Sequence, residues 1–173
     1  MLVSSAIYLI LISMGLLGKS WGLSDMLASD PARGARANAC TVQFLGKQYI
    51  LGTETLSDKL RNTLRRSQVN TYYIVFKFQV TSETGHTHKV YIQTLPVADL
   101  SGPAKVYCDC NDFKFRCAYV LEQHGSLLRS PKTDSKLGEA ISTAPKSSSG
   151  TALCKHALAA VQELIRNSNL YLG

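Results

Sequence analysis

The chain has 173 residues, of which 45% are hydrophobic and 18% are charged. This length allows one modest domain with a buried core, and the apolar fraction argues against a disordered chain. The 19 lysine and arginine residues outnumber the 12 aspartate and glutamate residues, so the formal charge is +7. Such a charge allows nucleic acid or an acidic protein surface as a partner without establishing either. The five cysteines are an odd number, which excludes a simple closed disulfide framework and favours a reducing compartment.

Residues 1–23 are predicted to be an apolar N-terminal helix or arm, because residues 2–17 contain no charged side chain. That stretch is shorter than the roughly 20 residues of a membrane span, and no lysine or arginine precedes it as in a secretory signal. Three interpretations stay open: a buried or interface helix, a membrane anchor, and an uncleaved signal. An exposed apolar helix promotes aggregation, so we expect this segment to dock on a partner surface.

The next segments are predicted to be irregular and then β-rich. Residues 24–40 contain Asp, Pro and Gly in a pattern typical of a linker. Residues 41–106 form a β-rich region with one helix. Within it, residues 41–51 are expected to make two short strands that meet at a turn around Gly46, and residues 57–66 are expected to be a helix.

The clearest strand signal lies in residues 71–80, which are rich in aromatic and β-branched side chains. Alternation along this strand places one set of side chains on a single face: Tyr72, Ile74, Phe76, Phe78 and Val80. Residues 88–95 are predicted to be the returning strand, and residues 104–107 a third strand. The chain is therefore predicted to be an α+β protein with a small antiparallel sheet of three or more strands.

Residues 107–172 are predicted to pack a C-terminal helix against this sheet. A short helix is expected between residues 113 and 125, followed by a long loop, residues 126–151, that is rich in Ser, Lys, Pro and Thr. Residues 152–167 then form a helix. Its expected apolar stripe consists of Leu153, Ala157, Ala160, Val161, Leu164 and Ile165.

Two tripeptides concentrate side chains that bind metals: Cys108-Asp109-Cys110 and Cys154-Lys155-His156. Cys108 and Cys110 follow a predicted strand, in which residues two apart point to the same side. Cys154 and His156 would point apart inside a regular helix. They converge if Cys154 lies just before the first turn and His156 within it, as the start of the apolar stripe indicates.

Three cysteines and one histidine predict a closed structural zinc site formed by Cys108, Cys110, Cys154 and His156. Four protein ligands complete a tetrahedral Zn²⁺ and leave no position for a catalytic water. Such a site would join the end of the sheet to the C-terminal helix, and its binding energy would become folding energy. Two other interpretations remain open, namely unligated core residues and a reactive thiol pair.

The order C-x-C, a variable insertion, and C-x-H leading into a helix resembles the SWIM-type zinc finger. Residues 105–166 carry the resemblance, with a strand before the first pair and a helix after the second, although the insertion is longer than in most of that family. The stretches CDCNDFKFRCAYVLEQHG and LCKHALAAVQEL look like the SWIM-like module in proteins of tailed bacteriophages. The resemblance implies a structural Zn²⁺ and a virion or phage-assembly protein.

These observations lead to one main functional hypothesis and two alternatives. The main hypothesis is a zinc-stabilised structural component of a tailed-phage virion, in the tail, baseplate or neck rather than the shell. It would be assembled in the host cytoplasm and would contact other virion subunits through residues 1–23 and the sheet. The first alternative is a nucleic-acid- or protein-binding SWIM module, with Lys132, Lys136 and Lys146 as nucleic-acid contacts. The second alternative is a small membrane-anchored zinc protein.

The sequence contains no Ser/His/Asp order, glycine-rich phosphate loop or carboxylate pair that would indicate an enzyme, so we expect no catalytic activity. Of the other cysteines, Cys117 is expected to be buried in the short helix and Cys40 to be a free thiol in the arm. His86 and His88, at the hairpin turn, are considered as a second metal pair. His124 is expected at the C-terminal end of the short helix.

Overall fold

The computed structural model describes residues 1–17, 20–29, 34–55, 62, 68–97, 99–129 and 151–172. Its centre is a four-stranded antiparallel sheet with the strand order β1-β2-β3-β4. The strands are β1 (Thr41–Thr55), β2 (Gln68–Thr81), β3 (Thr87–Thr94) and β4 (Lys105–Cys108). The helices are α1 (Ser5–Ser13), α2 (Leu23–Ala28), α3 (Gly34–Asn38), η2 (Phe113–Cys117), α5 (Ala118–Gln123), α7 (Lys155–Arg166) and α8 (Ser168–Leu172). The predicted α+β class and antiparallel sheet are confirmed.

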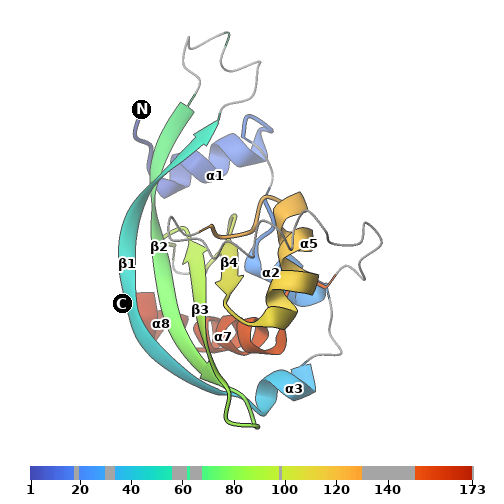
Figure 1. Ribbon diagram of the computed structural model, residues 1–173. Coiled ribbons are helices and arrows are strands. Elements are labelled where there is room, and N and C mark those ends of the chain that lie inside the picture. The colour runs from blue at the N-terminus through green and yellow to red at the C-terminus, as the bar shows by residue number, and fades with distance from the viewer. Residues whose placement is uncertain are drawn as a thin grey trace.

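The long strands β1 and β2 form a curved ribbon whose two ends carry different helices (Figure 1). α1 lies beside the end where β1 finishes and β2 begins, whereas α7 and α8 lie toward the other end. α7 contacts all four strands and also α3. The C-terminal helix is therefore the layer that covers most of one face of the sheet.

β1 is one continuous strand with a bulge, so the prediction of two short strands meeting at a turn is wrong. Phe44 pairs with Phe78 and Gly46 pairs with Lys77, which leaves Leu45 as the extra residue. Gly46 has a φ of 140°, a conformation that a Cβ disfavours, so a glycine is required at the bulge. A bulge bends a strand without ending its pairing. The sequence around Gly46 looks like that of a turn, which is why two strands were predicted.

β2 buries opposite faces in its two halves. The first half buries Val69, Thr71 and Tyr73, and the second half buries Ile74, Phe76, Phe78 and Val80. Successive side chains of a strand point to opposite faces, so the buried face changes between Tyr73 and Ile74. Tyr72 lies on the same face of β2 as Ile74, as predicted, but it is 50% exposed because α1 packs on the other face at this end.

Two hydrophobic cores result from this change of face. The main core joins β2, β3, β4, η2, α5 and α7, and its large buried side chains include Ile74, Phe76, Phe78, Ile92, Phe113, Leu121 and Leu164. The N-terminal core is smaller and consists of Val3, Tyr8, Leu17, Val69, Tyr73 and Leu95. β1 contributes to both cores, since Phe44 packs on the main core and Ile50 on the N-terminal core. The bulge lies between these two residues, so they point to opposite faces of the sheet.

The N-terminus extends the sheet beside the first half of β2. β3 pairs with β2 from Thr81 back to Ile74, so Asn70 lies beyond the end of that pairing. Val3 N donates to Asn70 O at 2.8 Å, and Asn70 N donates to Met1 O at 2.7 Å. The first residues therefore satisfy the backbone groups of β2 on the side that β3 does not reach.

α1 is the helix predicted within the apolar N-terminal segment. Ser4 caps it, because its Oγ accepts a hydrogen bond from Ile7 N at 3.3 Å. Tyr8 is buried and packs edge-on against Tyr73, with ring centroids 6.1 Å apart. The opposite side of the helix is exposed and apolar, with Ile7 and Ile10, and with Met14 at its C-cap. In the described part of the chain, none of the helices combines the length and the apolar character that a membrane span requires.

Three further segments were predicted from the sequence, and each has a different outcome. Residues 24–40, predicted to be a linker, include α3 and all of α2 except its first residue. The helix expected at residues 57–66 lies outside the described residues, apart from residue 62. The helix expected between residues 113 and 125 is confirmed as a π-helical turn, η2, followed by α5.

α7 forms the predicted C-terminal helix but begins at Lys155 and ends at Arg166. Ile165, predicted in the apolar stripe, is 40% exposed because it lies roughly 100° around the helix from the buried Leu164. α8 follows and places the Tyr171 ring against two core aromatics. The ring centroid of Tyr171 is 4.5 Å from that of Phe44 and 5.8 Å from that of Phe78.

Candidate metal centre

The first pair of predicted ligands lies where β4 ends. Cys108 is the last residue of β4 and pairs with Val90, and Cys110 follows before the first turn of η2. Phe113 N donates to Cys110 Sγ at 3.3 Å, so this sulfur caps the helical segment. The side chains of Cys108 and Cys110 are 0% and 4% exposed. The end of the strand thus directs both sulfurs into the protein, as predicted.

The second pair lies at the start of α7. Cys154 is the N-cap residue, with an extended backbone (φ −71°, ψ 169°), and His156 lies in the first turn. Ala157 N donates to Cys154 Sγ at 3.4 Å. The change from extended to helical backbone removes the divergence that a regular helix would impose. This confirms the predicted placement of Cys154 before the helix and His156 within it.

The four predicted ligands form one buried cluster. The ligand atoms of Cys108, Cys110, Cys154 and His156 all lie within 4.8 Å of one another. In a tetrahedral site, Zn–S bonds of about 2.3 Å and Zn–N bonds of about 2.0 Å place the ligand atoms roughly 3.5–3.8 Å apart. Cys154 Sγ and His156 Nδ1 are 4.0 Å apart, so small side-chain movements bring these donors to bonding distance of one ion.

The thiols of the cluster differ in their acidity. Burial raises the pKa of Cys108 and of Cys154 well above the ordinary thiol value, and hydrogen bonding with Cys110 adds to this rise. The pKa of Cys110 is lowered, because the Cys108 and Cys154 thiols donate hydrogen bonds to its sulfur. A metal ion that binds these sulfurs as thiolates must displace the protons of the thiols.

The imidazole of His156 has one buried nitrogen, Nε2, without a hydrogen-bond partner among the described residues. Its Nδ1 lies 4.0 Å from Cys154 Sγ, which is long for a hydrogen bond. A buried polar group without a partner is costly, whereas a coordinated metal would use one ring nitrogen. The group can hold a metal ion, and three thiolates with one imidazole are a donor set that suits zinc.

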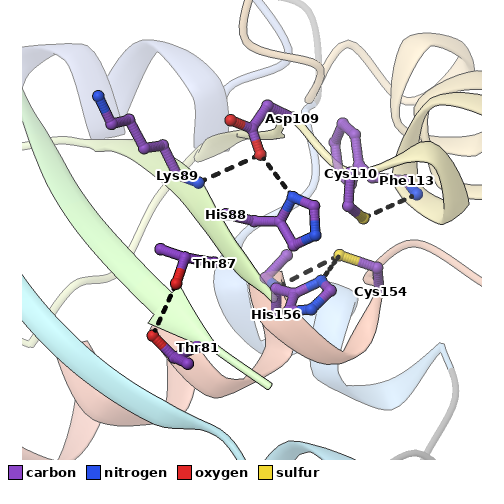
Figure 2. Close-up of polar contacts among 10 residues, drawn as sticks. Thr81, Thr87, His88, Lys89, Asp109, Cys110, Phe113, Cys154 and His156 are labelled. Carbon is purple, nitrogen blue, oxygen red and sulfur yellow. Dashed lines mark hydrogen bonds and ion pairs between the residues drawn. The ribbon is translucent and has the colours of Figure 1, made fainter. Parts of the chain in front are cut away.

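Two residues beside the cluster were not predicted to belong to it. Asp109 Oδ1 accepts hydrogen bonds from His88 Nδ1 at 3.0 Å and from Lys89 N at 3.2 Å. The ring centroid of His88 lies 4.5 Å from that of His156 (Figure 2). The His86–His88 pair considered from the sequence is not among the metal-binding clusters found in the described part of the chain. The sequence did contain a signal, since Asp109 lies inside the C-x-C motif, but only the β3–β4 register shows its partner.

The remaining predicted residues lie away from the cluster or outside the described chain. Cys117 is fully buried in η2, as expected, and the partly buried Cys40 donates from Sγ to Arg36 O at 3.5 Å. His124 is the C-cap of α5, as expected, and stacks on Trp21 with ring centroids 3.7 Å apart. The predicted nucleic-acid contacts lie outside the described residues: Lys132, Lys136 and Lys146.

Comparisons with known proteins assign the chain to no family. No protein-family model matches it, and neither a curated protein nor a solved structure shows significant similarity to it. The resemblance to the SWIM-type zinc finger therefore depends on the ligand pattern and on the strand and helix that present it.

Proposed function

We propose that the chain is a zinc-stabilised structural protein, in which Zn²⁺ bound by Cys108, Cys110, Cys154 and His156 joins the end of β4 to the start of α7. The observation that carries this proposal is the meeting of four buried donors within 4.8 Å. Four protein ligands fill a tetrahedral site and leave no position for water or substrate, so the metal acts structurally.

The position of the cluster explains why a metal would stabilise the fold. Cys108 and Cys110 belong to the end of the sheet, and Cys154 and His156 belong to the helix that covers it. Closing a long loop between such segments costs conformational entropy. The binding free energy of structural zinc, on the order of 10 kcal/mol, is available to offset this cost because the unfolded chain has no preformed site.

Metal content and thermal unfolding test the zinc site. We expect one Zn²⁺ per chain in protein purified without added chelator. Removal of the metal should lower the melting temperature, and zinc should restore it whereas magnesium should not, because thiolates are poor ligands for magnesium. A chain that binds no zinc, or that melts at the same temperature with and without it, would contradict the proposal.

We further propose, following the resemblance to tailed-phage modules, that the chain is a structural component of a phage particle in its tail, baseplate or neck. Exposed apolar side chains support a role in docking neighbouring subunits: Ile7 and Ile10 on α1, Met14 at its C-cap, and Tyr49, Leu51 and Tyr72 on the sheet. Leu51 and Tyr72 are direct cross-strand partners, so they form a continuous patch. Subunit contacts would remove such surfaces from water.

Mass spectrometry of density-purified particles tests the virion role. We expect the chain at a fixed copy number relative to known particle proteins. Its absence from the particles would end the virion proposal and leave the zinc site unaffected. Salt-dependent binding of nucleic acid would then be the next assay, because phosphate contacts weaken steeply as salt rises.

A further inference from the structure

His88 lies next to the four-residue cluster because of the register between β3 and β4. Val90 pairs with Cys108, and the pairing continues past the end of β4, since Asp109 N donates to Lys89 O at 3.3 Å. One further step along these antiparallel chains brings His88 opposite Cys110. The register thus brings a second imidazole to the end of the sheet that carries the cluster, where its ring contacts that of His156.

Asp109 fixes the orientation and the tautomer of His88. Its Oδ1 accepts from His88 Nδ1 at 3.0 Å and from the backbone of Lys89 at 3.2 Å, so the carboxylate is itself held by the strand. An ionised carboxylate can only accept hydrogen bonds, so Nδ1 of His88 carries the proton. The lone pair of the neutral ring is then on Nε2.

The ring of His88 lies between Asp109 and the buried cluster. Figure 2 shows Asp109 on one side of the His88 ring, with His156 and Cys154 on the other side. The centroids of the two imidazoles are 4.5 Å apart, with an angle of 51° between the ring planes. The side chain of His88 is 28% exposed, so the ring can move without disturbing the packed core.

The two histidines differ in the feature that usually accompanies metal binding. A metal-bound histidine commonly donates its other ring N–H to a carboxylate or a carbonyl, which orients the ring and raises its basicity. His88 has such a bond to Asp109. His156 has none from Nε2 within the described residues. The arrangement expected of a ligand is therefore present on the histidine outside the C-x-H motif.

We propose that His88, oriented by Asp109, is a second imidazole donor for the same metal and can replace His156 as the fourth ligand. This inference rests on the proposed zinc site and adds to it. The centre would have three fixed thiolates and two histidines that compete for one position. A metal could then exchange ligands there without leaving the protein.

Zinc titrations of single and double variants test this role. The dissociation constant is measured by competition with a chromophoric chelator for wild type, His156→Ala, His88→Ala and the double variant. We expect His156→Ala to bind one Zn²⁺ with at most about tenfold weaker affinity, and the double variant to be weaker than His156→Ala by about tenfold or more. His86→Ala is the matched control, because His86 lies exposed in the same hairpin, and it should bind as wild type does.

Histidine ring ¹⁵N NMR adds a direct readout. In His156→Ala, zinc should shift Nε2 of His88 toward the value of a metal-bound nitrogen. Equal affinities of His156→Ala and the double variant would overturn the proposal, as would a His156→Ala chain that cannot fold in zinc. Failure of wild type to bind zinc at all would instead contradict the zinc site itself, so the two failures are distinguishable.

Discussion

The two cores of this protein use the same strand but are completed in different ways. The N-terminal core is closed by packing alone, with Tyr8 of α1 against Tyr73 of β2. The main core has three thiols and an imidazole at the junction of β4 and α7, a group that could hold a metal ion. One core should therefore depend on metal and the other should not.

This difference also separates the two ends of β2. The buried face changes between Tyr73 and Ile74, so these two neighbouring residues pack in different cores. A perturbation of the metal cluster should first affect α7 and the strands that it covers. A perturbation of α1 should first affect the N-terminal end of β2. The predictions below test whether the two cores are as independent as this arrangement indicates.

The largest effect is expected for Cys154→Ser, which removes one proposed metal ligand and keeps a side chain that can cap α7. We expect loss of stoichiometric zinc and a loss of several kcal/mol of stability, equivalent to a fall in melting temperature of about 10 °C or more. Zinc analysis and thermal unfolding measure both effects. Cys40→Ser is the matched control, because Cys40 lies outside the cluster and should keep one zinc per chain. Retention of zinc by Cys154→Ser would contradict the assignment of this ligand.

Tyr8→Ala should break the N-terminal core and leave the metal in place. Tyr8 is 3% exposed, so truncation removes a large buried ring and should cost about 3 kcal/mol in urea unfolding. The matched control is Ile10→Ala on the same helix, where the side chain is 55% exposed and the cost should be small. Loss of zinc from Tyr8→Ala would show that the two cores are coupled.

Gly52→Ala tests the same core from the opposite strand. A Cβ at position 52 would overlap the ring of Tyr73, so the ring or the strand must move. Such overpacking typically costs about 1–3 kcal/mol, measurable as a lower urea midpoint with zinc content unchanged. Gln48→Ala, at an exposed position of the same strand, serves as the control. An equal midpoint for both variants would mean that Tyr73 does not need the space above Gly52.

The features that the sequence predicted depend on short-range patterns. The alternation in residues 71–80 and the turn after it define the β2–β3 hairpin, because a strand repeats every two residues. The C-x-C and C-x-H spacings define the cluster, because a strand end and a helix start each direct nearby side chains to one point. Both patterns can be recognised without knowing which segments meet in space.

The features that the sequence did not predict depend on contacts between distant segments. Tyr72 and Tyr73 are identical residues that point to opposite faces of β2. The docking of α1 on one of these faces decides which tyrosine is buried. The bulge at Gly46 resembles a turn until its pairing with β2 is known. The contact of His88 with Asp109 likewise requires the β3–β4 register. Local propensity is ambiguous in each case, and tertiary packing decides the outcome.

The smallest expected effect is a loss of stability of the N-terminal core at high pH. Burial raises the pKa of Tyr8 from 10.0 to about 12, and burial together with hydrogen bonding to Tyr8 raises the pKa of Tyr73. Tyr73 also donates to Glu54 Oε1 at 3.0 Å, and this carboxylate disfavours a nearby phenolate. Because the folded state holds these protons more tightly, their contribution is complete below pH 10 and is lost as pH rises toward 12.

Urea unfolding at pH 9 and pH 11 tests this sign. Between pH 9 and pH 11, the contribution of Tyr8 to the free energy of unfolding should fall by about 1 kcal/mol. This is near the most that a single group can lose at one pH unit above its pKa in the unfolded chain. Other groups also titrate there, so the decisive quantity is the difference between wild type and Tyr8→Phe, which cannot ionise at that position. A smaller pH-dependent loss in Tyr8→Phe is expected. An equal loss in both would mean that the Tyr8 hydroxyl is solvated in the folded state, and that α1 packs more loosely on β2 than α7 does on the main core.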